Sequence, residues 1–209
     1  MRTQLILTTA ALGLASLGAS AQVYSVNAVG YINLSVPAGN KLVLVANQLK
    51  NGDNKLATVI PTAAEGTLVY TYAQASGFTT SGFEFGAWGP GNPSVAPGVG
   101  FFASSPTAAT ITLVGEVPQG DLKTDLLQGL NLVSSQVPQA GKLQADLKYT
   151  PAEGDIVYQW DVAAQGYKAA NGYEFGSWGA GDPQIAVGEG FFLAKAAAGS
   201  WSRTFSVNQ

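Results

Sequence analysis

The sequence predicts an all-β protein built as two tandem antiparallel β-sandwich or small-barrel modules related by internal duplication. The chain has 209 residues, and its 26 glycines and 10 prolines separate apolar runs of about four to eight residues. This pattern is typical of short strands joined by turns. Segments of the first half also recur in the second half, which indicates a repeated unit. Short strands at regular spacing favour a sandwich or small barrel in each module.

The duplication is clearest in a stretch of 20 residues that occurs twice. Residues 83–102 align with residues 173–192 at an offset of 90, and 12 of the 20 positions are identical. Upstream, residues 42–49 match residues 130–137 at an offset of 88. We therefore predict one module at residues 22–117 and a second at residues 118–209. No Ser/Gly-rich or Pro-rich linker separates them, so we expect the modules to pack against each other.

The expected strands follow the apolar runs. They are residues 29–36, 42–48, 68–72, 83–88, 100–104 and 110–117 in the first module, and 130–136, 156–160, 173–178, 190–194 and 201–207 in the second. The last segment alternates large and small side chains, which indicates that one of its faces is exposed to solvent. Residues 56–60 and 143–147 are either single helical turns or loops.

The N-terminal residues predict a signal peptide. Arg2 precedes an apolar run at residues 5–17, and Ala19-Ser20-Ala21 forms an Ala-x-Ala cleavage site. We expect removal of residues 1–21 and export to the periplasm, the cell surface or the extracellular space. The apolar run is shorter than the roughly 20 residues of a spanning helix, and no second candidate follows. An exported chain without cysteine forms no disulfides, so its stability must come from a packed core.

Charge and composition exclude several classes of function. Without the leader, 9 basic and 13 acidic residues remain, a net charge of −4, which gives no basic footprint for nucleic acid. The absence of histidine removes the usual general base and metal ligand. We expect no cofactor and no metal site. The first module has 7 charged residues and the second has 15. Either the first module is an interaction face, for its twin module, a second copy of the protein or a surface, or the copies have drifted apart.

Short motifs give the chain a resemblance to known modules. They are Gly129-Leu130-Asn131-Leu132-Val133, Val157-Tyr158-Gln159-Trp160, Gly166-Tyr167 and Gly188-Glu189-Gly190-Phe191-Phe192. This arrangement resembles a group of secreted bacterial modules that are abundant in the Verrucomicrobia and neighbouring phyla. The first copy departs from it at Lys41 and Tyr72, which replace the glycine and the tryptophan. The resemblance implies a fold and an exported location and implies no activity.

Two glutamates are candidates for carboxylate chemistry. Glu84 and Glu174 occupy equivalent positions between two aromatic residues. A glycosidase requires two carboxyl groups about 5–10 Å apart across a sugar, and repeat symmetry could bring these two together. The alternative is that the aromatic neighbours are buried and each glutamate faces solvent. We expect the second arrangement.

Two tryptophans and the loops that follow them are candidates for ligand binding. Trp88 and Trp178 each precede a Gly-rich loop, which contains Asn92 in the first module and Asp182 in the second. An exposed indole beside a polar loop stacks on sugar rings, and two copies would add avidity. The alternative is that both tryptophans belong to the cores.

The sequence therefore favours a secreted, non-enzymatic structural or interaction protein of the cell surface or matrix. The alternative is a carbohydrate-binding protein that uses an exposed tryptophan in each module. An enzyme acting on glycans through Glu84 and Glu174 ranks third. The expected partners are a glycan, another surface protein or a second copy of the chain bound through the first module.

Overall fold

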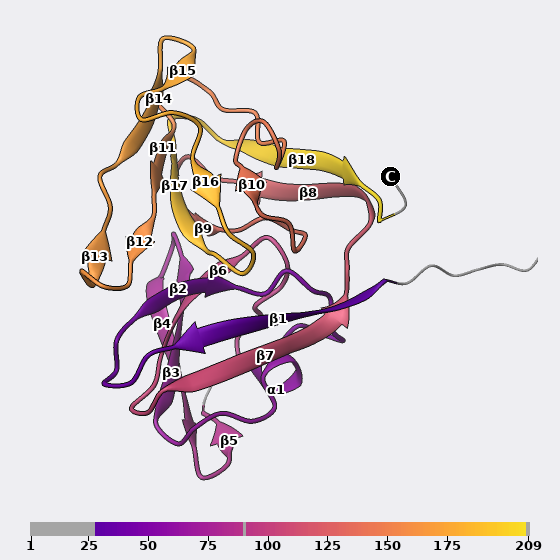
Figure 1. Ribbon diagram of the computed structural model, residues 1–209, viewed down its shortest axis with the longest axis vertical. Coiled ribbons are helices and arrows are strands. Elements are labelled where there is room, and N and C mark those ends of the chain that lie inside the picture. Colours follow the sequence, from indigo (N-terminus) through magenta and orange to yellow (C-terminus); the bar gives the residue numbers. More distant parts are fainter. Residues whose placement is uncertain (1–27, 90, 208–209) are drawn as a thin grey trace, which may run out of the picture.

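The computed structural model describes residues 28–89 and 91–207. The predicted leader, residues 1–21, lies outside them. The regular structure of the described chain is almost all antiparallel β-strand with a single helical turn, which confirms the all-β class, and none of its sheets closes on itself (Figure 1). No helix in these two ranges is long and apolar enough to cross a membrane.

The elements of the first module end at residue 116 and those of the second begin at residue 120. The first set is β1 (Val29–Val36), β2 (Val43–Ala46), α1 (Leu56–Val59), β3 (Thr67–Ala73), β4 (Gly77–Glu84), β5 (Ala87–Trp88), β6 (Gly100–Ser104) and β7 (Ala109–Glu116). The second set is β8 (Gly120–Leu126), β9 (Gly129–Val133), β10 (Gly141–Lys142), β11 (Ile156–Tyr158), β12 (Trp160–Asp161), β13 (Gly166–Tyr167), β14 (Asn171–Glu174), β15 (Ser177–Trp178), β16 (Gln184–Ile185), β17 (Phe191–Lys195) and β18 (Gly199–Phe205).

Each module contains a five-stranded antiparallel sheet, and the two sheets have the same strand order. In the first the order is β2-β6-β3-β4-β5, and in the second it is β9-β17-β11-β14-β15. Strands at the same place in the two orders come from segments that align in the sequence. Each module also has a two-stranded ribbon, β1 with β7 and β8 with β18.

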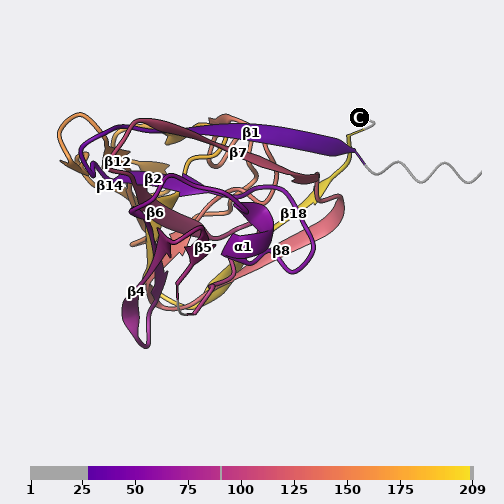
Figure 2. The ribbon, with the colours of Figure 1, turned by 90° about the horizontal axis from the view of Figure 1, so that it is seen from below.

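The ribbon of each module covers one face of its sheet. Along β1 the buried residues alternate with exposed ones, because successive side chains of a strand point to opposite faces. Its buried face, with that of β7, packs against β2, β3 and β6 in the first core. Figure 2 shows this ribbon along one side of the molecule, with β2, β6 and α1 beneath it. A second core lies between the β8–β18 ribbon and the second sheet.

A third apolar cluster joins the modules. Leu44 and Phe102 of the first module pack with Leu132 and Phe192 of the second, and aromatic residues of both sheets surround them. The backbones also meet, since Val45 bridges Glu189 and Val99 bridges Val133. These contacts agree with the expectation that the two modules pack against each other.

Some predicted elements need correction. The predicted strands at residues 83–88 and 173–178 are wrong, because in each the chain reverses at a Phe-Gly pair and forms a hairpin, β4–β5 and β14–β15. Of the two alternatives for residues 56–60, the structure has the helical turn, at residues 56–59. Residues 143–147 form non-helical turns instead. The strand β8 has no counterpart among the predicted strands, because charged residues alternate along it and no apolar run marks it.

Candidate functional site

The candidate functional site is the tip of the hairpin that ends each five-stranded sheet. Phe85 and Gly86 join β4 to β5 with φ angles of 54° and 77°, and Phe175 and Gly176 join β14 to β15 with φ angles of 53° and 76°. Positive φ at both central residues is the pattern of a type I′ turn, which suits the twist of a two-residue hairpin. The two modules therefore form the same tip from the same residues.

The phenylalanine of each tip lies almost wholly in solvent. Phe85 is 98% exposed and Phe175 is 97% exposed. A left-handed backbone costs a residue with a Cβ about 1–2 kcal/mol. A phenylalanine that stays in water also forgoes about 1.5–3 kcal/mol of burial free energy. Neither the backbone conformation nor the exposure of the ring therefore favours phenylalanine at this position when no partner is bound.

A carboxylate holds each tip in this conformation. Glu65 accepts hydrogen bonds from the backbone N–H groups of Phe85 and Gly86 at 2.8 and 2.9 Å. Glu153 accepts the equivalent bonds in the second module, from Phe175 at 2.9 Å and from Gly176 at 2.7 Å. Hydrogen bonds to a charged acceptor are stronger than neutral ones. The strained turn is therefore fixed from outside, and the aromatic ring is presented on a defined backbone.

Other left-handed positions show what this chain uses where only a turn is required. Seven residues other than glycine have positive φ in the described part of the chain, and the five besides the two phenylalanines are all polar. They are Asn40, Asn54, Asn92, Lys148 and Gln165. Asparagine adopts this conformation more readily than other residues with a Cβ. The turn alone therefore does not account for a phenylalanine in both modules.

The two tips point to opposite ends of the molecule. Along the longest axis, β5 lies at one end and β15 at the other (Figure 1). Glu84 and Glu174, the residues before the phenylalanines, are exposed at these separate ends. The structure therefore does not bring the two glutamates together, and they do not form a pair that could act on one sugar. Each instead adds a negative charge beside an exposed ring.

The tryptophans serve the packing of the hairpins. Trp178 is buried, and its ring packs edge-on to Tyr173 at 5.2 Å. Of the two alternatives, the core position therefore holds for Trp178. Trp88 is half-buried against the first core, and its Nε1 donates to the carbonyl of Ile60 at 2.6 Å. Each indole anchors the short strand behind the tip, because large aromatic side chains bury the most apolar area.

Asn92 and Asp182 hold the loops that follow the tryptophans. The Oδ1 atom of Asn92 accepts a hydrogen bond from the N–H of Ala57 at 2.9 Å. The carboxylate of Asp182 accepts from the N–H groups of Gln144 and Ala145, both at 2.9 Å. These oxygens satisfy backbone donors at the starts of corresponding turns, a role typical of Asn and Asp. Within residues 28–89 and 91–207, no three acidic side chains gather to hold a metal ion.

An aromatic groove lies where the modules meet. It has a volume of about 490 Å³, and Leu42, Tyr70, Phe78, Thr80, Phe102, Trp160 and Tyr167 line it. Phe78 and Tyr167 are about half exposed at its rim. Partial burial raises the pKa of the Tyr167 hydroxyl, which therefore remains a neutral donor and acceptor. Trp160 is fixed because its Nε1 donates to the Leu42 carbonyl at 2.9 Å.

The sequence pointed to the segments that contain the tips, but it predicted a single strand in each and missed the exposed phenylalanines. It placed both aromatic neighbours of each glutamate in the interior, yet Phe83 is buried and Phe85 is exposed. The available signal was the glycine that follows Phe85 and Phe175, because a residue before glycine between two strand-forming segments is a hairpin signal. The groove was missed because its residues come from separate segments of both modules.

Comparisons with protein-family models, with curated proteins and with solved structures found no match to this chain.

Proposed function

We propose that this chain is an exported, non-enzymatic interaction protein that binds a partner at each of its two ends. The observation that carries the proposal is the pair of exposed phenylalanines, Phe85 and Phe175, on identical strained turns. Aromatic residues that protrude from a surface are typical anchors of protein interfaces. Because the tips face away from each other, one molecule can join two partners.

The surroundings of the tips define the partner. Glu65 and Glu84 lie beside the first ring, and Glu153 and Glu174 lie beside the second. No ion pair neutralises these four glutamates within the described residues. The complementary surface is therefore an apolar pocket with lysine or arginine at its rim, because opposite potentials meet across an interface. A protein with such pockets fits these tips, whereas an anionic lipid surface repels them.

Internal duplication and export are parts of the same proposal. Twelve identities in 20 aligned residues and the equal strand order of the two sheets support duplication of one module, with a sandwich formed by each sheet and its ribbon. The N-terminal sequence and the resemblance to secreted bacterial modules support a location at the cell surface or in the matrix. Duplication of a one-sided binding module accounts for a protein with two equivalent ends.

Binding to envelope fragments of the producing bacterium tests this function. We expect the purified protein to sediment with the fragments. The double variant Phe85→Asn with Phe175→Asn should stay in the supernatant, because asparagine keeps the turn and removes the ring. Tyr31→Asn is the matched control, since Tyr31 is an aromatic residue that is 72% exposed on β1, away from both tips. Equal sedimentation of the double variant and the wild type would refute a role for the tips.

The groove between the modules favours carbohydrate binding as a second candidate function. Its aromatic walls and the hydroxyl groups of Tyr70, Thr80 and Tyr167 combine the stacking surface and the hydrogen-bonding groups that sugars require. Titration with soluble polysaccharides should change the fluorescence of Trp160. Phe78→Ala should weaken this response, and Tyr31→Ala should not. If no polysaccharide changes the fluorescence or is retained, the groove is not a glycan site.

A further inference from the structure

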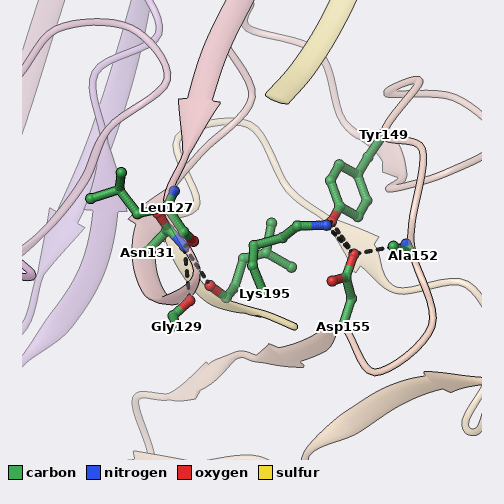
Figure 3. A network of polar contacts seen from close by, with 8 residues as sticks. Leu127, Gly129, Asn131, Tyr149, Ala152, Asp155 and Lys195 are labelled. Atoms are coloured by element: carbon green, nitrogen blue, oxygen red, sulfur yellow. Dashed lines mark hydrogen bonds and ion pairs between the residues drawn. The ribbon is translucent and has the colours of Figure 1, made fainter. Parts of the chain in front are cut away.

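A buried polar cluster in the second module is formed by Tyr149, Asp155 and Lys195 (Figure 3). Asp155 comes immediately before β11, and Lys195 is the last residue of β17. These strands pair with Ile156 opposite Ala194, so Asp155 and Lys195 face each other one position further along. Tyr149 reaches the same place from the segment after β10. The three side chains are between 0% and 8% exposed.

The two oxygen atoms of the Asp155 carboxyl group differ strongly in their contacts. Its Oδ2 atom lies 2.6 Å from the Nζ of Lys195 and accepts hydrogen bonds from the Tyr149 hydroxyl at 2.5 Å and the Ala152 N–H at 2.8 Å. Lys195 Nζ also donates to the Tyr149 hydroxyl at 3.0 Å. The Oδ1 atom is buried and has no hydrogen-bond partner. A carboxylate with one unsatisfied oxygen is costly to bury.

We propose that Lys195 and Asp155 form an intramolecular amide bond between Nζ and the side-chain carbonyl carbon. The reaction begins with transfer of a proton from Lys195 Nζ to Asp155 Oδ2 along their 2.6 Å contact, which gives an amine beside a carboxylic acid. Holding the amine against the acid in a fixed geometry replaces a bimolecular encounter. The product amide has no charge, and its unpaired Oδ1 is a neutral carbonyl oxygen.

The contacts supply a path for the proton that the reaction must move. The Lys195 nitrogen attacks the carboxyl carbon, and the new N–C bond forms as the C–Oδ2 bond breaks. Lys195 donates a proton to the Tyr149 hydroxyl, which passes its own proton to Oδ2, as a general acid does for a leaving group. The products are one amide and one water molecule, and neither an oxidant nor a reductant is required.

The first module has a neutral pair at the corresponding place. Thr67 and Ser105 align with Asp155 and Lys195, and the Thr67 hydroxyl donates to Ser105 Oγ at 3.4 Å. The scaffold therefore does not require an ion pair here. In a chain without cysteine, an amide between neighbouring strands would provide the covalent constraint that disulfides provide in other exported proteins.

Tryptic digestion of the denatured protein tests the bond directly. Cleavage after Lys148, Lys168, Lys195 and Arg203 yields peptides 149–168, 169–195 and 196–203 if no bond is present. An acylated Lys195 is not cleaved, so we expect peptide 149–168 joined to peptide 169–203. Its mass should be lower than the sum of the two by one water molecule. The three separate peptides without the joined species would overturn the proposal.

Variants test the role of each group. Lys195→Arg should give only separate peptides, because a guanidinium group is not a nucleophile here, and the matched control Lys168→Arg should keep the bond. Tyr149→Phe removes the proton path, so the joined fraction should fall and should increase slowly with time after purification. A joined fraction in Tyr149→Phe equal to that of the wild type at the earliest time would contradict the proposed path. The wild-type digest alone decides whether the bond exists, even if a variant fails to fold.

Discussion

Gly100 and Gly190 lie against each other at the junction of the two modules. A Cβ atom added to Gly100 would be 3.3 Å from the α-carbon of Gly190, and one added to Gly190 would be 3.2 Å from the α-carbon of Gly100. These glycines align at the offset of 90 that relates the repeated segments. The junction therefore brings equivalent positions of the two aligned segments together, and neither position has room for a side chain.

This contact predicts that Gly190→Ala destabilises the protein. The new Cβ would lie 2.7 Å from the carbonyl oxygen of Val45, so the modules must separate or the strand must shift. Overpacking of this kind costs about 1–3 kcal/mol, which urea unfolding measures. Gly166→Ala is the control, because its Cβ would meet no atom closer than 4.0 Å. Equal unfolding midpoints for the two variants would show that the junction tolerates a side chain.

The strained tips predict that Phe85→Asn does not reduce stability. Asparagine tolerates the left-handed backbone better than phenylalanine, and Asn-Gly is the favoured pair for a type I′ turn. The exposed ring contributes no packing that could be lost, so we expect the free energy of unfolding to stay the same or to rise by up to about 1 kcal/mol. A loss of more than about 1 kcal/mol in urea unfolding would mean that the ring stabilises the fold.

The carboxylate that holds each tip predicts a local effect. Glu65→Ala removes the acceptor of the Phe85 and Gly86 N–H groups, so these two amides should exchange with deuterium faster. The amides of Phe175 and Gly176 are the internal control, because Glu153 still holds them. Unchanged exchange at Phe85 and Gly86, or an equal change at both tips, would show that Glu65 does not specifically hold the first tip.

The buried tyrosine of the second module predicts a loss of stability in alkali. Burial raises the pKa of Tyr149 above its ordinary value of 10.0, and the hydrogen bond to Asp155 adds to the rise. The folded chain therefore keeps a proton that the unfolded chain releases above pH 10. The contribution of protonated Tyr149 to the free energy of unfolding is complete below pH 10. It is lost as the pH rises further, by up to about 1.4 kcal/mol per pH unit. Unfolding measured between pH 9 and about 11.5 should show a smaller slope for Tyr149→Phe than for the wild type.

Local patterns in the sequence predicted much of the fold. The boundaries of β1 and β6 agree with the predicted strands, because apolar alternation or a continuous apolar run marks each one. The repeat predicted that the second half would follow the first, and the two sheets have the same strand order. For residues 56–60 a helical turn was one of two alternatives, and the structure has the turn α1 at Leu56–Val59.

The sequence did not predict the features that depend on contacts between distant segments. The carboxylate of Glu65, which lies 20 residues away, holds the reversal at Phe85, and no local pattern indicates that contact. The groove depends on how two modules pack, since Tyr70 comes from one and Trp160 from the other. A core position for Trp178 was one of two alternatives, and the local sequence did not show the hairpin that places this residue in the core.

The bridging of partner-bearing particles tests the two-ended account most directly. Envelope fragments of the source organism are mixed with protein, and their growth in size is followed by light scattering while bound protein is measured by sedimentation. We expect the wild type to bind and to join fragments into larger particles. Phe85→Asn and Phe175→Asn should each still bind but should no longer join them. If either single variant joins fragments as well as the wild type does, the two tips are not the two binding ends.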